Sequence, residues 1–252
     1  MKYRILIAAA TAAAAGTAYA DQHANSDWSG FYFGTQVGGA FNPDDAGELD
    51  FDGPGDIDSA FGDNFEGEFQ SSFQGGFHAG YDHQMDRTVI GVVVDTNFTN
   101  IEQRQSAFSA TPAAYSEVRT IEYLISGRLR AGYLMTPKFL PYVTGGVAWG
   151  DIDYRFDTDT PANVREEDAD RDGWGYTLGV GFETLITENL SIGAEYLYTD
   201  LGHNDFRTNL SAEGGGGQAA FGNAASGGTD AEGSDDSFDF HSIAFKLSYR
   251  YD

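Results

Sequence analysis

Apolar and polar residues alternate along eight separate stretches of the chain. These stretches cover residues 31–41, 73–82, 90–98, 122–133, 141–149, 174–183, 190–199 and 243–251. Alternation with a period of two places successive side chains on opposite faces of a β-strand. The connections are long and short in turn, as in a barrel with short turns at one end and long loops at the other. The pattern predicts an all-β fold, an eight-stranded antiparallel up-and-down transmembrane β-barrel.

Two features indicate that the apolar face of this barrel points outward. The polar face is rich in glycine, which suits a narrow lumen better than a water-exposed surface. The aromatic residues gather near the strand ends, as they do at the two interfaces of a membrane barrel. One predicted girdle contains Tyr81, Tyr133, Tyr249 and Tyr251, and the other contains Phe41, Phe73, Tyr123, Trp149, Trp174 and Tyr198. A soluble, lipocalin-like barrel, which would bury this face, is the alternative.

The first twenty residues have the pattern of a secretory signal peptide. Lys2 and Arg4 precede an apolar core from Ile5 to Ala15, and Ala18-Tyr19-Ala20 forms a small-residue cleavage site. No later apolar run approaches the roughly 20 residues that a transmembrane helix needs. We therefore expect a signal peptide over residues 1–20 and a barrel domain over residues 21–252, located in the outer membrane of a Gram-negative cell.

Charged residues also occur on the predicted inner face. Because the interior of an eight-stranded barrel is about filled by side chains, opposite charges enclosed there should pair with one another. The set comprises Asp82, Asp95, Arg128, Arg130, Glu183, Glu195, Lys246 and Arg250. The pattern favours a lumen closed by an ion-pair network. A narrow, low-conductance porin-like channel or a proton relay through the same residues is the alternative.

Composition excludes several classes of function. Cysteine is absent, so the chain has no disulfide, thiolate metal ligand or cysteine nucleophile. The 33 glycines and the aromatic content of 14% suit tightly curved strands and membrane girdles. The formal charge of −25 excludes nucleic acid as a partner, because a polyanion would be repelled.

The predicted outer loops contain much of this negative charge. Residues 43–69 include ten acidic residues and no lysine or arginine. Three interpretations are open: a solvated, self-repelling surface, divalent-cation bridging to lipopolysaccharide, or a discrete calcium loop. Asp168, Asp170 and Asp172 match the opening of an EF-hand loop, but Gly179 stands where its bidentate glutamate belongs. We expect no cofactor beyond Ca²⁺ or Mg²⁺ weakly bound by these acidic loops.

Catalysis is the competing hypothesis, because some small outer-membrane barrels modify lipid A or cleave proteins. Such catalysts need a nucleophile or an activated water beside an oriented histidine and an acid. His241 and Ser242 are neighbours, but adjacent residues of a strand point to opposite faces. His78 faces the predicted lumen near Asp82 with no nucleophile beside it. We therefore expect the protein not to be an enzyme.

Five segments of the predicted barrel have a familiar sequence. They are residues 28–34, 127–133, 140–148, 179–183 and 195–200. Together they resemble the small outer-membrane β-barrel proteins of alphaproteobacteria, which include surface antigens and haemin-binding members and are distantly related to opacity-type and OmpA-like barrels. The resemblance implies the fold and leaves the loops uncovered. Such barrels usually close with an aromatic residue, whereas Asp252 follows Tyr251 here.

The sequence predicts a structural and surface-exposed outer-membrane protein that contributes to envelope integrity or surface interaction. Its expected partners are outer-membrane lipids, lipopolysaccharide and, during biogenesis, the barrel assembly machinery. The termini are expected on the periplasmic side and the long loops outside the cell. Capture of haemin, another small ligand or an adhesion partner is the alternative, with His203 and His241 available but no paired histidines at ligand spacing.

Overall fold

The computed structural model describes residues 27–43, 49–52, 64–109, 113–158, 163–169, 172–203, 206–212, 229–233 and 237–251. The predicted signal peptide, Asp170 and Asp252 lie outside these residues. The described strands, β1 to β13, form two antiparallel sheets. None of the described segments is a helix long and apolar enough to cross a membrane.

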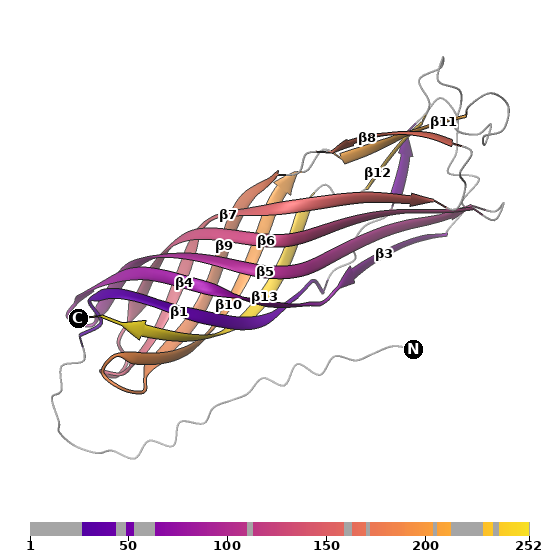
Figure 1. Cartoon of the computed structure of the whole chain (residues 1–252). Helices are drawn as coiled ribbons and strands as arrows, with labels where there is room; N and C mark the ends of the chain where they lie inside the picture. Colours follow the sequence, from indigo (N-terminus) through magenta and orange to yellow (C-terminus); the bar gives the residue numbers. More distant parts are fainter. Residues whose placement is uncertain are drawn as a thin grey trace, which may run out of the picture.

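The larger sheet closes on itself, and each strand of the ring pairs with the next (Figure 1). In ring order the strands are β1 (Gly30–Phe41), β4 (Ser72–Met85), β5 (Thr88–Ser109), β6 (Ala113–Tyr133), β7 (Phe139–Thr158), β9 (Asp172–Leu185), β10 (Leu190–His203) and β13 (Ser237–Arg250). The ring closes because β5 pairs with β6 and β13 pairs with β1. The predicted all-β, antiparallel up-and-down barrel is therefore confirmed.

The two ends of the barrel differ. At one end, here called the turn end, short connections join β4 to β5, β6 to β7 and β9 to β10. Asp27 and Tyr251 also lie there, as the hydrogen bond from the Tyr251 backbone N–H to the Phe31 carbonyl indicates. At the opposite end, here called the loop end, β5, β6 and β7 rise beyond the other strands (Figure 1).

In the rising part of β5, β6 and β7, residues 101–109, 113–121 and 151–158 are strands, which corrects the expectation of long loops after the stretches 90–98 and 141–149. Strand pairing between β5 and β6 continues to Ser109 and Ala113, and β3 (Phe65–Gln70) adds to the side of β5. Shifts in register mark irregularities near Phe98 and Ile121. Because of the second shift, Ile121 is buried and Glu122, which parity places inside, is exposed. We call this rising part the extension.

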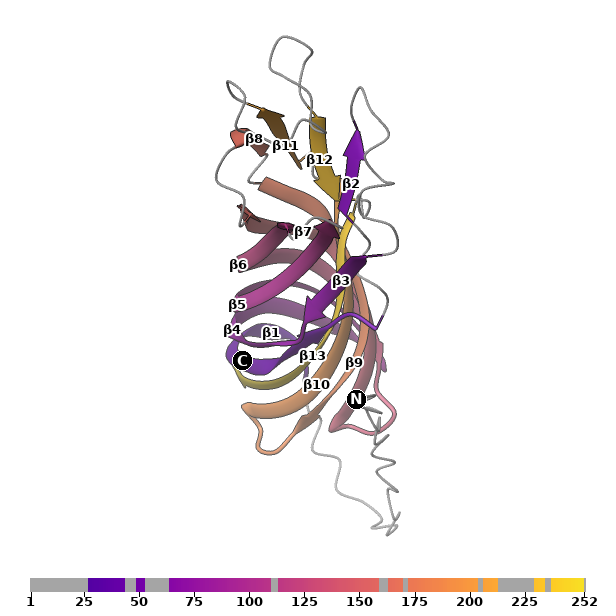
Figure 2. The same ribbon diagram turned by 90° about the vertical axis from the view of Figure 1, so that its right-hand side faces the viewer.

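A smaller sheet lies at the loop end (Figure 2). Its strands in order are β2 (Leu49–Asp52), β12 (Thr229–Gly233), β11 (Phe206–Ala212) and β8 (Asn163–Ala169). Its inner residues, among them Phe51 and Leu210, pack against Tyr115 and Phe156 of the extension. We call it the cap sheet, and it also corrects the expectation that these segments are loops.

The outward face of the ring has exposed apolar side chains in its middle, here called the apolar belt. Examples are Val94, Leu129, Val180 and Phe245, each at least two-fifths exposed. Of the residues assigned to the two girdles, Tyr81, Tyr133, Tyr249, Tyr251, Phe73, Tyr123 and Trp174 are exposed, and Phe41, Trp149 and Tyr198 are half-buried. The apolar side chains of the belt thus point away from the lumen, and the polar residues of the same strands point into it.

Candidate functional site: the barrel lumen

The inward positions of β4, β5, β6, β9, β10 and β13 supply the charged residues of the lumen. The eight residues of the expected ion-pair network are Asp82, Asp95, Arg128, Arg130, Glu183, Glu195, Lys246 and Arg250, and all of them are buried. They divide into two clusters of two cations and two carboxylates each. The period of two in every strand is what aims these side chains at one another.

The turn-side cluster joins Asp82, Arg130, Glu183 and Arg250. Arg130 donates to Asp82 through Nε at 2.8 Å and through Nη2, and its Nη1 donates to Glu183 Oε2 at 2.9 Å. Arg250 donates from Nη2 to Asp82 Oδ2 and lies 3.4 Å from Glu183 Oε1. Ser191 donates its hydroxyl to Glu183. Each carboxylate therefore accepts from both guanidinium groups, so that no charge of this cluster lacks a partner.

The loop-side cluster joins Asp95, Arg128, Glu195 and Lys246. Arg128 donates from Nη2 to Asp95 Oδ2 at 2.6 Å and from Nη1 to Glu195 Oε1 at 2.9 Å. Lys246 Nζ lies 3.5 Å from Glu195 Oε1, and the Tyr142 hydroxyl donates to Glu195 Oε2 at 2.9 Å. Buried carboxylates need this number of partners, because their desolvation is costly.

Aromatic rings support the arginines of the turn-side cluster. The Arg130 guanidinium lies 4.8 Å from the ring centroid of Tyr32 and 5.0 Å from that of Tyr142. Arg250 lies 4.8 Å from the ring of Trp28. The Tyr32 ring fits only because Gly80 stands across from it, where a Cβ atom would collide with the phenol. The period of two places Tyr32 and Tyr142 on the inner face, but it does not predict that they support arginines.

An apolar layer closes the lumen below the turn-side cluster. Trp28 is completely buried there among Val89, Leu134, Leu140 and Leu185. Its indole N–H donates to the Pro137 carbonyl at 3.0 Å, and its own carbonyl accepts from Arg250 at 2.6 Å. Residues just before β1 are thereby held inside the barrel mouth.

Next to Trp28, the exposed Asp27 makes a local turn. The Ser29 backbone N–H donates to the Asp27 carboxylate at 2.8 Å, and this hydrogen bond lowers the pKa of Asp27.

A second apolar layer lies above the loop-side cluster. It contains Ala40, Ile101, Ile121, Leu124, Ala148, Ile152, Leu201, Phe238 and Phe240. Neither apolar layer was predicted from the sequence. The available signal was in the pattern: Phe238 and Phe240 alternate with Asp239 and His241, so the apolar residues there take the inward phase.

Among the described histidines, His78 lies in the lumen beside a serine that the sequence pattern did not predict, and His241 lies apart from it. His78 is buried in the lumen and its Nε2 lies 2.8 Å from the Ser248 hydroxyl. His241 lies on the outer surface, where its Nδ1 contacts the Tyr196 hydroxyl at 2.6 Å, whereas Ser242 is buried inside. Within the described ranges no three histidine or acidic side chains are placed to hold a metal ion. The proposed calcium loop includes Asp170, which lies outside those ranges.

An apolar outer belt around a buried, charge-balanced interior defines an integral membrane β-barrel. The chain matches the outer membrane protein beta-barrel domain family over residues 6–251, and it belongs to that family. It is an outer-membrane protein.

Two relatives and one solved structure describe the similarity further. The 31 kDa outer-membrane immunogenic protein of Brucella melitensis biotype 1 is 33% identical over 124 residues, covering 49% of this chain and 51% of the relative. The 22 kDa outer membrane protein of Rhizobium leguminosarum bv. viciae is 31% identical over 127 residues, covering 50% and 52%. The chain thus spans about half the length of these relatives. OprG from Pseudomonas aeruginosa shares the fold, with a TM-score of 0.51 at 15% identity over 89% of this chain and 97% of that one.

Proposed function

We propose that this protein is a closed outer-membrane barrel with a structural and surface-display role. In this proposal the barrel anchors the extension and the cap sheet at the cell surface and contributes to envelope integrity, without conducting solutes. The observation that carries it is the burial of large or paired side chains at three successive levels of the lumen. Trp28 fills the turn end, the two ion-pair clusters fill the middle, and the layer with Phe238 and Phe240 fills the loop end.

The chemistry of the filling opposes a water path. An eight-stranded barrel has an interior just wide enough for side chains. Charged groups that already hydrogen-bond to one another have few free donors or acceptors for a passing solute. Separating them would leave uncompensated buried charge. The apolar layers on both sides would have to open before water reached these ions. The proposal is therefore of a lumen that stabilises the barrel.

The proposed orientation places the loop end outside the cell and the turn end in the periplasm. Short turns on the periplasmic side and longer segments outside are the usual arrangement of bacterial barrels. The names of the Brucella relatives describe those proteins as immunogenic. The extension beneath the cap sheet would offer a surface of this kind, in contact with lipopolysaccharide at its base.

Planar-bilayer recording tests the closed lumen. Purified full-length protein should give no reproducible open steps at neutral pH. A triple variant, Trp28→Ala with Phe238→Ala and Phe240→Ala, removes large side chains from both apolar layers and is expected to show brief, small openings. Phe245→Ala, which changes only the outward belt, is the matched control and should stay silent. Reproducible steps from the unmodified protein would overturn the proposal.

The structural role has its own test in the cell. Deletion of the gene should raise sensitivity to detergent and to a divalent-cation chelator, and the unmodified gene should restore resistance. If the deletion strain keeps full resistance, the envelope role fails, whatever the conductance measurement gives.

A further inference from the structure

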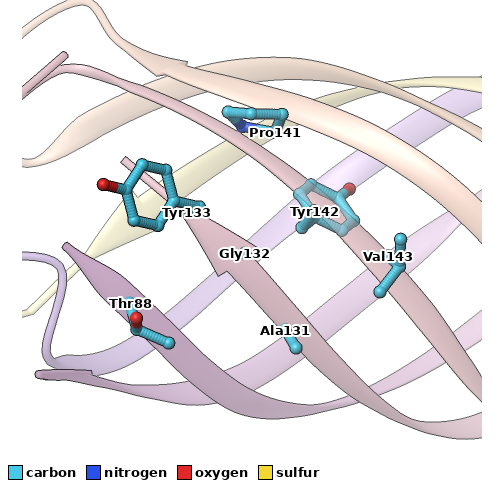
Figure 3. Close-up of a pocket in the computed structure, with 7 residues that line it drawn as sticks. All are labelled: Thr88, Ala131, Gly132, Tyr133, Pro141, Tyr142 and Val143. Carbon is cyan, nitrogen blue, oxygen red and sulfur yellow. The ribbon is translucent and has the colours of Figure 1, made fainter. Parts of the chain in front are cut away.

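A hollow of about 360 Å³ lies in the outward wall of the barrel near the turn end (Figure 3). Its outward lining comes from three neighbouring strands: Thr88 of β5, Ala131 and Tyr133 of β6, and Pro141 and Val143 of β7. The hollow is shallow and wide open toward the outside of the barrel, so a ligand in it would keep one side in contact with lipid. The hollow opens on the apolar belt, so its surroundings are membrane lipid.

Local sequence explains the hollow. Ala131 stands opposite Ile90 on one side and Val143 on the other, and its methyl group is too short to fill the space between them. Pro141 adds a compact ring and lacks a backbone N–H donor. Val143, which lines the hollow, is 59% exposed, as other outward valines of the belt are. Ala131 therefore forms the floor of the hollow, and apolar side chains form its sides.

Polar groups gather at the end of the hollow that faces the turns. Thr88 and Tyr133 are direct cross-strand partners, and Figure 3 shows both side chains on the same side of the hollow. Arg87 precedes Thr88 in the β4–β5 turn, and Lys138 lies in the β6–β7 turn, and both are exposed. The Leu134 backbone N–H donates to the Arg87 carbonyl at 2.7 Å, which holds the two turns side by side. Two hydroxyls thus lie at this end of the hollow, and the two turns next to it each contain one exposed cation, on a chain of net charge −25.

We propose that this hollow binds one anionic phospholipid. Its acyl chain lies over Ala131 between Tyr133 and Val143, and its phosphate meets the Thr88 and Tyr133 hydroxyls and the charges of Arg87 and Lys138. The apolar belt is already the interface with membrane lipid, and the hollow is continuous with it. The paired cations select an anionic headgroup over a zwitterionic one, since each cation near a lipid surface favours anionic lipid.

Native mass spectrometry of the full chain tests the acyl-chain part. Protein released from vesicles containing dioleoylphosphatidylglycerol should retain one such lipid, and Ala131→Phe should lose it because the ring fills the floor. Ala79→Phe is the matched control: Ala79 also faces outward, between Phe33 of β1 and Val94 of β5, and its variant should keep the lipid. Heat-dependent gel migration confirms that each variant is folded. Retention by folded Ala131→Phe, or equal loss from Ala79→Phe, would overturn the proposal.

Removing the two cations tests whether the site selects an anionic headgroup. Arg87→Gln and Lys138→Gln should each weaken phosphatidylglycerol retention about fivefold and leave phosphatidylcholine retention unchanged. Arg155→Gln removes an exposed arginine from the extension and serves as control. Equal retention of both lipids by the unmodified protein would overturn the anionic selectivity. A dimer of the unmodified protein that Ala131→Phe dissociates would instead assign the hollow to a second copy of this chain and overturn the lipid site.

A third measurement does not depend on any variant. A phosphatidylglycerol with a photoreactive acyl chain should give adducts concentrated between residues 131 and 143 of the unmodified protein. Adducts spread evenly over the apolar belt would overturn the proposal.

Discussion

The belt and the extension are built by the same strands with opposite chemistry. In β7, Val143 and Val147 point outward and Thr144 points into the lumen. A few residues later Asp153 is on the outside, whereas Ile152 and Phe156 are buried. The change occurs where the strand passes the aromatic residues at the loop end. The solvent therefore sets which phase of the alternation is apolar: hydrocarbon favours apolar side chains outside, and water favours them inside.

The two regions also depend on different forces. The hydrophobic effect stabilises the extension, because Phe156, Tyr115 and their neighbours leave water when they pack under the cap sheet. The hydrophobic effect stabilises the belt much less, because the outward side chains of the belt contact an apolar medium. The belt depends on its backbone ladder and on the buried ion pairs. Substitutions of one kind should therefore have unequal effects in the two regions.

The largest effect is expected in the turn-side cluster. Asp82→Asn leaves Arg130 and Arg250 close together without the carboxylate that both contact. Breaking a buried pair by removing one partner costs about 3–5 kcal/mol. The variant should lower the free energy of unfolding by that amount in a urea titration in lipid vesicles. Glu102→Gln, at a half-buried pair on the side of the extension, should change it by less than about 1 kcal/mol. Equal effects would contradict the view that buried charge stabilises the belt.

The next largest effect distinguishes apolar residues buried in the extension from apolar residues that face lipid in the belt. Phe156→Ala removes a buried ring from the core beneath the cap sheet and should cost about 3–5 kcal/mol. The loss should appear as faster proteolysis of the cap sheet and extension, while the belt still shows heat-dependent gel migration. Phe182→Ala removes a ring of the belt that is 46% exposed, where lipid fills the space. If Phe182→Ala destabilised the protein as much as Phe156→Ala, the proposed division of forces would be wrong.

A charge placed on the outer face should be costly in one region only. Val180 lies halfway along the belt, opposite Val143 and Tyr196. Val180→Arg should reduce the free energy of unfolding in vesicles by about 2–4 kcal/mol. Asp153→Arg places the same side chain on the outer face of the extension, where water solvates it, and should be nearly neutral. A similar cost at both positions would show that the extension also lies in hydrocarbon.

The barrel was predictable because its signal is periodic and local. Parity alone placed Asp82 and Arg130 inside and Val180 outside, since a regular strand has only two faces. The extension was not predictable in this way. Beyond Phe98 the residues are polar on both faces, as with Glu102 and Gln103, so the contrast that marks a half-buried strand disappears.

The contacts inside the lumen were harder to predict from the sequence than the extension. Parity says which residues point inward, but pairing depends on register between strands far apart in the chain, as for Asp82 and Arg250. Trp28 precedes the first strand, and no local pattern reveals that it turns back into the mouth. The irregularity at Ile121 shifted the phase by one residue, which misplaced Glu122. Long-range register and bulges are properties of the closed ring, so only the structure reports them.

The smallest effect concerns a pair of charges in water. Arg155 and Asp157 of the extension are 3.0 Å apart, with 65% and 56% of their side chains exposed. Solvent and salt screen such a pair, so Asp157→Asn should change the free energy of unfolding by less than about 1 kcal/mol. The residual effect should vanish in high salt, whereas the effect of Asp82→Asn should persist because no ion reaches the filled lumen. A salt dependence of equal size at both sites would mean that the lumen admits ions, which would count against a closed barrel.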